Sequence, residues 1–156
     1  MFWNYRNVIY LGYFFCIFVG HANHVIAFTV LLSHGVTLGV QQTIRYDKIL
    51  TNVGNAYDAT SGIFLVPVSG IYSLSASLMG DPNHGIHVQL VKNGIELVRL
   101  WTGGAASYEL ASHTLNINLA QNDKIWVQNR DSGNPILYAS ENYNMFSAVL
   151  LHEGHF

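Results

Sequence analysis

Most of the chain is patterned as short β-strands rather than helices. Beyond residue 25, apolar or alternating runs are separated by turn residues at roughly the 8–12-residue spacing that is typical of sandwiches and barrels. Ala27–Leu32 is an apolar run rich in β-formers, which predicts a buried strand. No long segment has a convincing 3.6-residue period, so almost no helix is expected.

Turn residues predict where several strands end. Asn93-Gly94 separates two alternating runs, His87–Lys92 and Ile95–Trp101, and this dipeptide favours the positive φ angles of a type I′ hairpin. Further turns, a polar loop and a final apolar strand follow at Gln121–Asp123, Asp131–Pro135 and Met145–Leu151.

The first 22 residues have the pattern of a secretory signal peptide. Arg6 precedes the apolar run Val8–Val19, which is about as long as a signal-peptide core and shorter than the ~20 residues of a membrane span. Gly20-His21-Ala22 places small residues three and one before a cut after Ala22. We therefore expect residues 1–22 to be removed and residues 23–156 to form one secreted domain with no membrane span. An N-terminal membrane anchor or a buried strand is the alternative.

The composition indicates that the domain needs a large core or a partner. Half of the residues are apolar and only 10% are charged, below the roughly 25% of typical soluble proteins. Part of the surface is therefore expected to be covered by a partner or by copies of the chain. The net charge is −2 with Lys and Arg scattered singly, which argues against nucleic-acid binding. The one cysteine, Cys16, lies in the signal segment, so no disulfide is expected in the domain.

A regular cadence of aromatic and turn residues runs from Tyr46 to Ala76. Large aromatic side chains in β-rich runs suit a core between two sheets, and Asn and Gly positions make turns. Pro67 ends a strand because it has no N–H for a ladder, and Gly70 permits a tight reversal into the next strand. The positions that define the cadence are Asn52, Tyr57, Phe64, Gly70 and Tyr72.

This cadence resembles that of the globular head domain of complement subcomponent C1q. The resemblance continues downstream and covers about residues 25–152. Val91–Gly94 is similar to the family's Lys-Asn-Gly hairpin, Leu119–Val127 to its next strand pair, and the run that begins at Phe146 to its closing strand.

Four positions depart from the family pattern, and such volume changes are compensated locally in a core. They are Tyr46 in place of a Phe, Leu74 and Ala76 in place of aromatic residues, and Ala148 in place of a Gly. The resemblance implies an all-β, ten-stranded jelly-roll sandwich of the C1q/TNF-like type that assembles as a homotrimer. Burial of apolar residues at the trimer centre would explain the low charge.

No catalytic or zinc-binding set stands out. The sequence contains no nucleophile elbow, zinc-protease motif or P-loop, so no catalytic residue is assigned and no enzyme is expected. His84 and His87 stand three apart, but a zinc site needs about four ligands and no third partner is near them in sequence. His113 alternates onto the same side as Leu115 and Ile117, which favours a core or interface histidine.

Calcium is the cofactor that the resemblance leaves open, because some members of the family bind it through loop carboxylates and carbonyls. Three loop aspartates are candidates by residue type and location: Asp81, Asp123 and Asp131. A lone loop aspartate is usually only solvated, so no cofactor is assigned, and the sequence names no ligand-binding residue.

Three functions are compatible with the sequence. The resemblance favours a secreted, lectin-like pattern-recognition protein of innate immunity, whose trimeric head binds microbial surface carbohydrates or lipopolysaccharide with avidity. A cytokine- or hormone-like ligand for a cell-surface receptor protein and an extracellular matrix component are the alternatives. The sequence has no Gly-X-Y repeat, which argues against recruitment of complement proteases through collagen.

Overall fold

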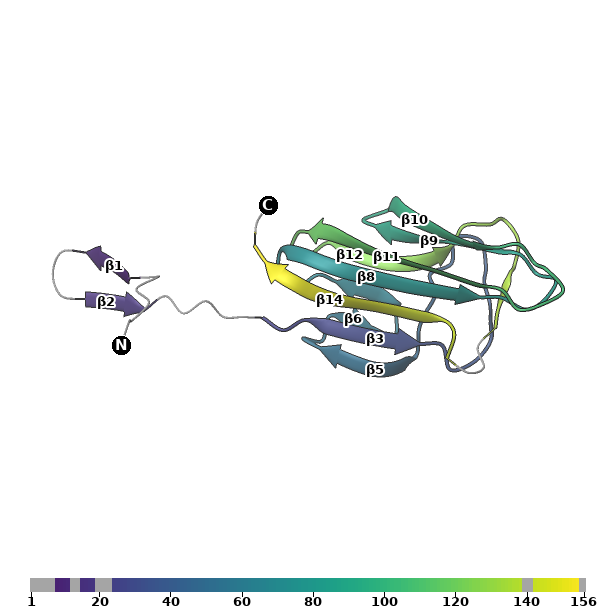
Figure 1. Cartoon of the computed structure of the whole chain (residues 1–156), viewed down its shortest axis with the longest axis horizontal. Helices are drawn as coiled ribbons and strands as arrows, with labels where there is room; N and C mark the ends of the chain where they lie inside the picture. The colour runs from purple at the N-terminus through teal and green to yellow at the C-terminus, as the bar shows by residue number, and fades with distance from the viewer. Residues whose placement is uncertain (1–7, 12–14, 19–23, 139–141, 155–156) are drawn as a thin grey trace.

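Two β-sheets packed face to face form the body of the molecule (Figure 1). The computed structural model describes residues 8–11, 15–18, 24–138 and 142–154, and every regular element within these ranges is a strand. Each of the two large sheets has five strands, and all recorded strand pairs are antiparallel. The predicted all-β sandwich of ten strands is confirmed.

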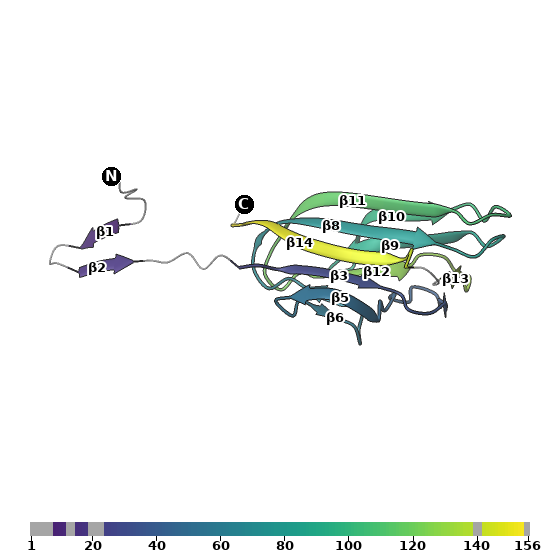
Figure 2. The same ribbon diagram turned by 60° about the horizontal axis from the view of Figure 1, so that its bottom comes forward.

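One sheet contains three of the longest strands and has the order β11-β8-β14-β3-β5. Figures 1 and 2 show these strands running side by side along the length of the sandwich. Their bounds are β3 (Ala27–Leu31), β5 (Lys48–Val53), β8 (Gly70–Met79), β11 (Leu110–Leu119) and β14 (Met145–Glu153).

The other sheet has the order β10-β9-β12-β7-β6. Its bounds are β6 (Tyr57–Asp58), β7 (Ile63–Leu65), β9 (Ile86–Lys92), β10 (Ile95–Thr102) and β12 (Lys124–Asn129). The hairpin between β9 and β10 turns at Asn93 and Gly94, whose φ angles are 51° and 86°. These positive values confirm the predicted hairpin turn.

Two small pairings lie outside these sheets. β4 (Val36–Thr37) pairs with β13 (Ile136–Leu137), and β1 (Val8–Leu11) forms a hairpin with β2 (Phe15–Phe18) that stands apart from the sandwich in both ribbon views. The predicted cleavage after Ala22 falls outside the described residues, so the signal peptide stays a prediction. In the described ranges, no helix has the length and hydropathy to cross a membrane.

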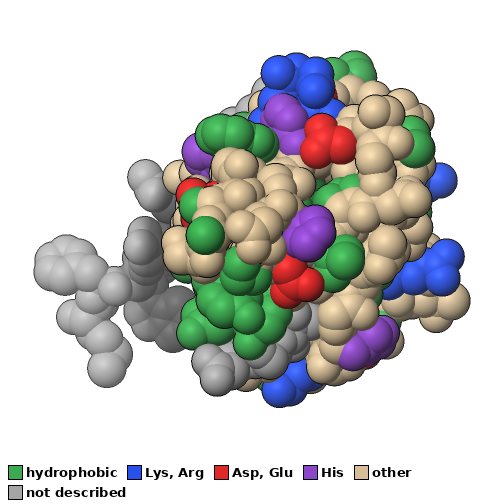
Figure 3. Space-filling view, turned by 90° about the vertical axis from the view of Figure 1, so that its right-hand side faces the viewer, with side chains coloured by type: hydrophobic (Ala, Val, Ile, Leu, Met, Phe, Trp, Pro, Cys, Tyr) green, Lys and Arg blue, Asp and Glu red, His purple; other side chains and the backbone are tan. Residues whose placement is uncertain are grey.

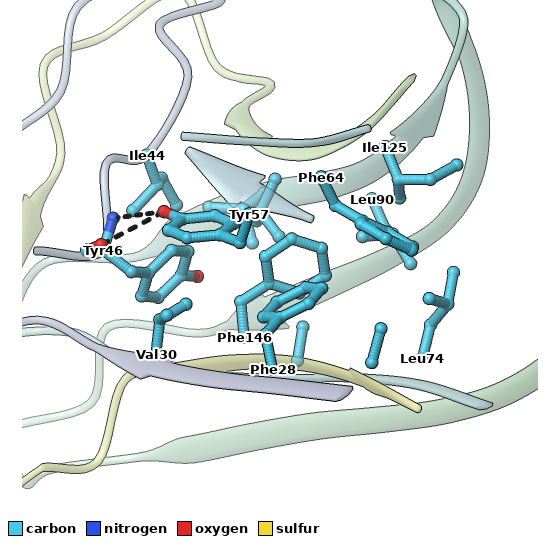
Figure 4. Packing of buried hydrophobic residues seen from close by; sticks show 14 of the residues in the cluster. Phe28, Val30, Ile44, Tyr46, Tyr57, Phe64, Leu74, Leu90, Ile125 and Phe146 are labelled. Carbon is cyan, nitrogen blue, oxygen red and sulfur yellow. Dashed lines mark hydrogen bonds between the residues drawn. The ribbon is translucent and has the colours of Figure 1, made fainter. Parts of the chain in front are cut away.

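Aromatic rings fill the space between the sheets (Figure 4). Phe28 lies at the centre, with ring centroids about equally far from Tyr57 (5.1 Å), Phe64 (5.1 Å) and Phe146 (5.0 Å). Tyr72 adds an edge-on contact to Phe64 at 5.6 Å. All five side chains are buried, and each such ring removes a large apolar area from water.

Polar contacts fix two members of the cadence in place. The Tyr57 hydroxyl donates to the Tyr46 carbonyl (3.1 Å) and accepts from the Tyr46 N–H (3.0 Å), as Figure 4 shows. The Asn52 amide bonds both the N–H (3.2 Å) and the carbonyl (2.9 Å) of Tyr57. Burial raises the pKa of Tyr57 to about 12 and moves the pKa of Tyr46 in the same direction. Asn52 and Tyr57 thus tie the connection between β5 and β6 to the segment that precedes β5.

Gly70 has a different role from the predicted one. It is the first residue of β8, and a Cβ there would lie only 2.4 Å from the His152 carbonyl oxygen of β14. The residue is therefore a glycine because β14 passes so closely, not because the chain reverses there. Leu74, Ala76 and Ala148 are all buried, and Ala148 lies opposite both Phe28 and Leu74.

His113 is not a core histidine. It lies on β11, at the edge of its sheet and opposite Ala76, and its side is the one that carries the partly buried Leu115 and Ile117. His113 itself is exposed, because the core does not extend under this part of an edge strand. The alternation was predicted correctly, a core position is excluded, and the interface position stays a prediction.

Candidate functional site

The outward face of the sheet β11-β8-β14-β3-β5 is rich in small, uncharged side chains and also carries the exposed apolar residues Val53 and Val149. We call this the serine face and define it by the outward residues Thr29, Ser73, Ser75, Ser77, Ser112, Thr114, Asn116 and Ser147. They alternate with the buried residues of the same strands, such as Tyr72 and Leu74 on β8.

The strands bring these residues into continuous rows. Ser147 of β14 stands opposite Thr29 on one side and Ser75 on the other, and Ser75 stands opposite Thr114. The Ser75 and Thr114 hydroxyls hydrogen-bond each other at 2.8 Å. Small uncharged groups cost little to remove from water when they keep hydrogen bonds, and they let another sheet approach closely.

The opposite sheet presents larger and more polar side chains. We call the outward surface of β10, β9 and β12 the tryptophan face and define it by Trp101, Glu96, Arg99, His87, Gln89, Trp126 and Gln128, with Arg130 and Asp131 at the end of β12. Register places these residues in rows across the three strands. Gln128 pairs with Gln89, and Gln89 pairs with Arg99.

A charge network organises the middle of the tryptophan face. Glu96 Oε1 lies 2.6 Å from Nε of Arg99, and Glu96 Oε2 lies 3.5 Å from Nε of Arg130. The hydrogen bond from Arg99 is the main reason that the pKa of Glu96 is lowered. Next to this network, the Trp126 indole N–H donates to Gln128 Oε1 at 2.5 Å. The polar groups on this face are thus held by ion pairs and hydrogen bonds and remain accessible to solvent.

The structure separates the three candidate aspartates. Asp123 precedes β12, whereas Asp81 and Asp131 follow β8 and β12 at the other end of the sandwich, the end viewed in Figure 3. On that end, acidic, basic and histidine side chains lie next to one another. Asp131 Oδ1 lies 3.6 Å from Nδ1 of His87.

Asp123 is committed to its own turn. Its carboxylate accepts from Asn93 Nδ2 (2.7 Å) and the Ala120 N–H (2.8 Å) and lies 2.8 Å from Lys92 Nζ. Burial would raise the pKa of Asp123, but these donors, led by Lys92, outweigh burial and lower it. Both carboxylate oxygens are therefore occupied within the protein, which does not suit a calcium ligand.

Metal-ligating side chains are not gathered elsewhere in the described part of the chain. His84 hydrogen-bonds the Pro82 carbonyl at 3.0 Å, whereas His87 faces Asp131. Among the residues that the structure describes, no three His, Cys, Asp or Glu side chains come close enough to hold a metal ion. We therefore derive no step through calcium or zinc.

A small pocket lies at the opposite end from the loops of Figure 3. It has a volume of about 210 Å³ and is lined by His24, Leu150, Leu151, His152 and Glu153. The His24 ring lies 2.9 Å from the Glu153 carboxylate. This volume is below the roughly 300–1,000 Å³ of typical small-molecule sites, so we assign it no ligand.

Both faces contain residues that the sequence did not single out. Trp101, Arg99 and Glu96 were predicted only as part of a strand, and the serines of β8 were not noted at all. The available signal was alternation: Trp101 follows the buried Leu100, and Ser73, Ser75 and Ser77 alternate with buried neighbours. The side of each strand that packs against the other sheet is buried, and the alternate side faces solvent.

Solved structures share this arrangement of strands. The globular domain of zebrafish complement 1qA protein matches with a TM-score of 0.70 and 15% identity, over 83% of this chain and 99% of that one. Eiger TNF from S. frugiperda matches with a TM-score of 0.71 and 14% identity, over 86% and 97%. Murine APRIL at pH 5.0 gives 0.65 and 17%, over 81% and 99%. At these identities the likeness shows the fold alone, which is the C1q/TNF-like jelly roll.

The family model of the C1q domain matches residues 27–151, and the chain belongs to this family. Complement C1q tumor necrosis factor-related protein 2 of Homo sapiens is 32% identical over 99 residues, which are 64% of this chain and 32% of that protein. The collagen alpha-1(X) chain of Mus musculus is 34% identical over 138 residues, or 83% and 20%. The chain thus spans a third or less of these relatives. Members of the family are non-enzymatic binding or structural proteins.

Proposed function

We propose that this chain is a secreted recognition protein of innate immunity that binds carbohydrates or lipopolysaccharide on microbial surfaces. The observation that carries the proposal is the composition of the tryptophan face. It combines two tryptophans with amide, guanidinium and carboxylate groups, and such a set serves to bind ligands rich in hydroxyl groups.

The proposal includes assembly of the chain as a homotrimer through the serine face. The chain belongs to the C1q domain family, and the serine face offers no charged side chain among the residues that define it. Burying that face therefore requires no desolvation of an ion. The tryptophan faces of three copies would then point outward, and three weak sites acting together would raise the affinity for a repetitive surface.

Binding and mass measurements on the secreted protein test this function. We expect saturable binding to bacterial cells and to part of a glycan panel, and a mass in solution about three times that of one chain. A monomeric mass would contradict the trimer. Absence of saturable binding to cells and glycans would contradict recognition, and recovery of a specific membrane receptor by crosslinking would favour a receptor ligand instead.

A further inference from the structure

Trp101 is exposed where a folded chain normally covers such a ring. It projects outward from β10, and 64% of its surface is accessible. A tryptophan combines a large apolar area with one N–H donor, and tryptophans are enriched at places where another molecule binds. The neighbours of Trp101 indicate the chemistry of that molecule.

The tip of the indole lies over Gly103. A Cβ added at Gly103 would lie 3.4 Å from Cη2 and 3.7 Å from Cζ2 of Trp101, so a larger residue there would contact the ring. Glu109 fixes the next residues, because its carboxylate accepts from the Gly104 N–H at 3.0 Å. The main chain beside the ring is thus held by a side chain of the same loop.

His87 lies next to Trp101 across the strand pair, Asp131 lies next to His87, and both have hydrogen-bonding capacity left over. His87 is the cross-strand partner of Trp101, which places their Cβ atoms roughly 5 Å apart. The 3.6 Å between His87 Nδ1 and Asp131 Oδ1 is longer than a hydrogen bond. Both groups can therefore bond hydroxyl groups of a ligand.

Hydrogen bonds from Asn129, which is fully buried, hold the loop that carries Asp131. The Asp131 N–H donates to Asn129 Oδ1 at 3.0 Å. Asn129 Nδ2 lies 2.8 Å from the Gly39 carbonyl, 3.2 Å from the Asp131 carbonyl and 3.3 Å from the Gly133 carbonyl. The main chain at Asp131 is thus tied to a buried residue before any ligand binds.

We propose that Trp101, His87 and Asp131 form a subsite for one neutral pyranose ring, an inference that rests on the glycan-binding function proposed above. The apolar C–H face of the sugar packs on the indole, whose π-face carries partial negative charge. Asp131 accepts hydrogen bonds from two neighbouring hydroxyl groups, and the His87 ring bonds a further oxygen.

The charges around the subsite select neutral over acidic sugars. Asp131 brings a negative charge to the subsite, whereas the guanidinium groups of Arg99 and Arg130 are both directed at Glu96. The carboxylate of a uronic or sialic acid would face Asp131 at short range, and like charges at such distances disfavour binding.

The test measures binding of the secreted full chain to immobilised polysaccharides. Mannan, galactan and dextran are the neutral probes, and polygalacturonate is the acidic probe. Trp101→Ala removes the ring and Trp101→Phe keeps an aromatic surface. Ile95→Ala is the matched control, because Ile95 lies on the same strand and is 71% exposed.

We expect saturable binding of the wild-type chain to at least one neutral polymer and weaker binding to polygalacturonate. Trp101→Ala should bind at least about tenfold more weakly, whereas Trp101→Phe and Ile95→Ala should stay within about threefold of wild type. Quenching of tryptophan fluorescence by acrylamide gives a second readout on the unmutated chain. The bound sugar should shield Trp101 and reduce quenching.

The outcomes separate the subsite from the function. Equal binding by Trp101→Ala and Ile95→Ala, or unchanged quenching with sugar bound, overturns the subsite and leaves the proposed function standing. Stronger binding to polygalacturonate than to every neutral polymer overturns the choice of a neutral sugar. No saturable binding of the wild-type chain to any polymer or to bacterial cells overturns both.

Discussion

The serine face and the tryptophan face are the two outer surfaces of one sandwich, yet they are built from different chemistry. The first is rich in short hydroxyl and amide side chains on long strands and includes the exposed Val149. The second holds long charged and aromatic side chains, with Glu96 bound to two arginines and Trp101 left exposed. Short neutral side chains suit contact with another rigid sheet, whereas long polar ones suit a hydrated ligand.

A charge placed on the serine face should have the largest effect, which is loss of the trimer. Ser75 lies on β8, in the middle of the sheet between β14 and β11. In a trimer, Ser75→Arg would bury an unpaired guanidinium, at a cost of several kcal/mol. We expect sedimentation to show a monomer and binding to bacterial cells to lose its avidity. Ile95→Arg places the same charge on β10 and should leave the trimer intact; a trimeric Ser75→Arg would contradict the assignment of this face.

A cavity in the shared core should affect both faces at once. Phe28 touches Tyr57, Phe64 and Phe146, and 1% of its surface is exposed. Phe28→Ala should lower the free energy of unfolding by about 3–5 kcal/mol, measured by denaturant titration. Ile95→Ala should change it by less than about 0.5 kcal/mol. A similar, small effect of both substitutions would show that the faces do not depend on this core.

Removing one hydroxyl should have a smaller effect that depends on pH. Tyr57→Phe leaves the Tyr46 N–H and carbonyl without their partner, which should cost about 1–3 kcal/mol. Because the pKa of Tyr57 is raised to about 12, its contribution is complete below the unfolded pKa of roughly 10 and is lost as the pH rises towards 12. Denaturant titrations from pH 8 to 11.5 should show a shallower alkaline loss in the variant. An unchanged slope would contradict this role.

The sequence predicted the scaffold better than the surface, for a physical reason. Strand periodicity, the turn at Asn93 and Gly94, and the aromatic cadence are local signals, and the structure has them where they were expected. Gly70 was explained wrongly, because the chain that passes it, β14, is about 80 residues away in sequence. His113 was placed on the correct side, and of its two predicted positions, core and interface, only the core one is excluded.

The candidate site depends almost entirely on pairing between distant strands. Asp131 was a candidate as a loop carboxylate, but its partner is His87, and the Trp101 ring beside them comes from a third strand. Glu96 meets Arg130 only because β12 and β10 flank β9. The pairing register between these distant strands is fixed by the fold as a whole, so local sequence patterns could not predict which side chains meet.

Hydrogen exchange of the purified protein, with and without a saturating neutral polysaccharide, is the sharpest test of the difference between the two faces. We expect peptides of β8 and β14 to be protected in the wild-type protein with and without sugar, and to lose part of that protection in Ser75→Arg, because the trimer contact adds to the protection from their ladder hydrogen bonds. Peptides around His87, Trp101 and Asp131 should gain protection only when the sugar is present. Sugar-induced protection on β8 and β14, with none around Trp101, would contradict the account.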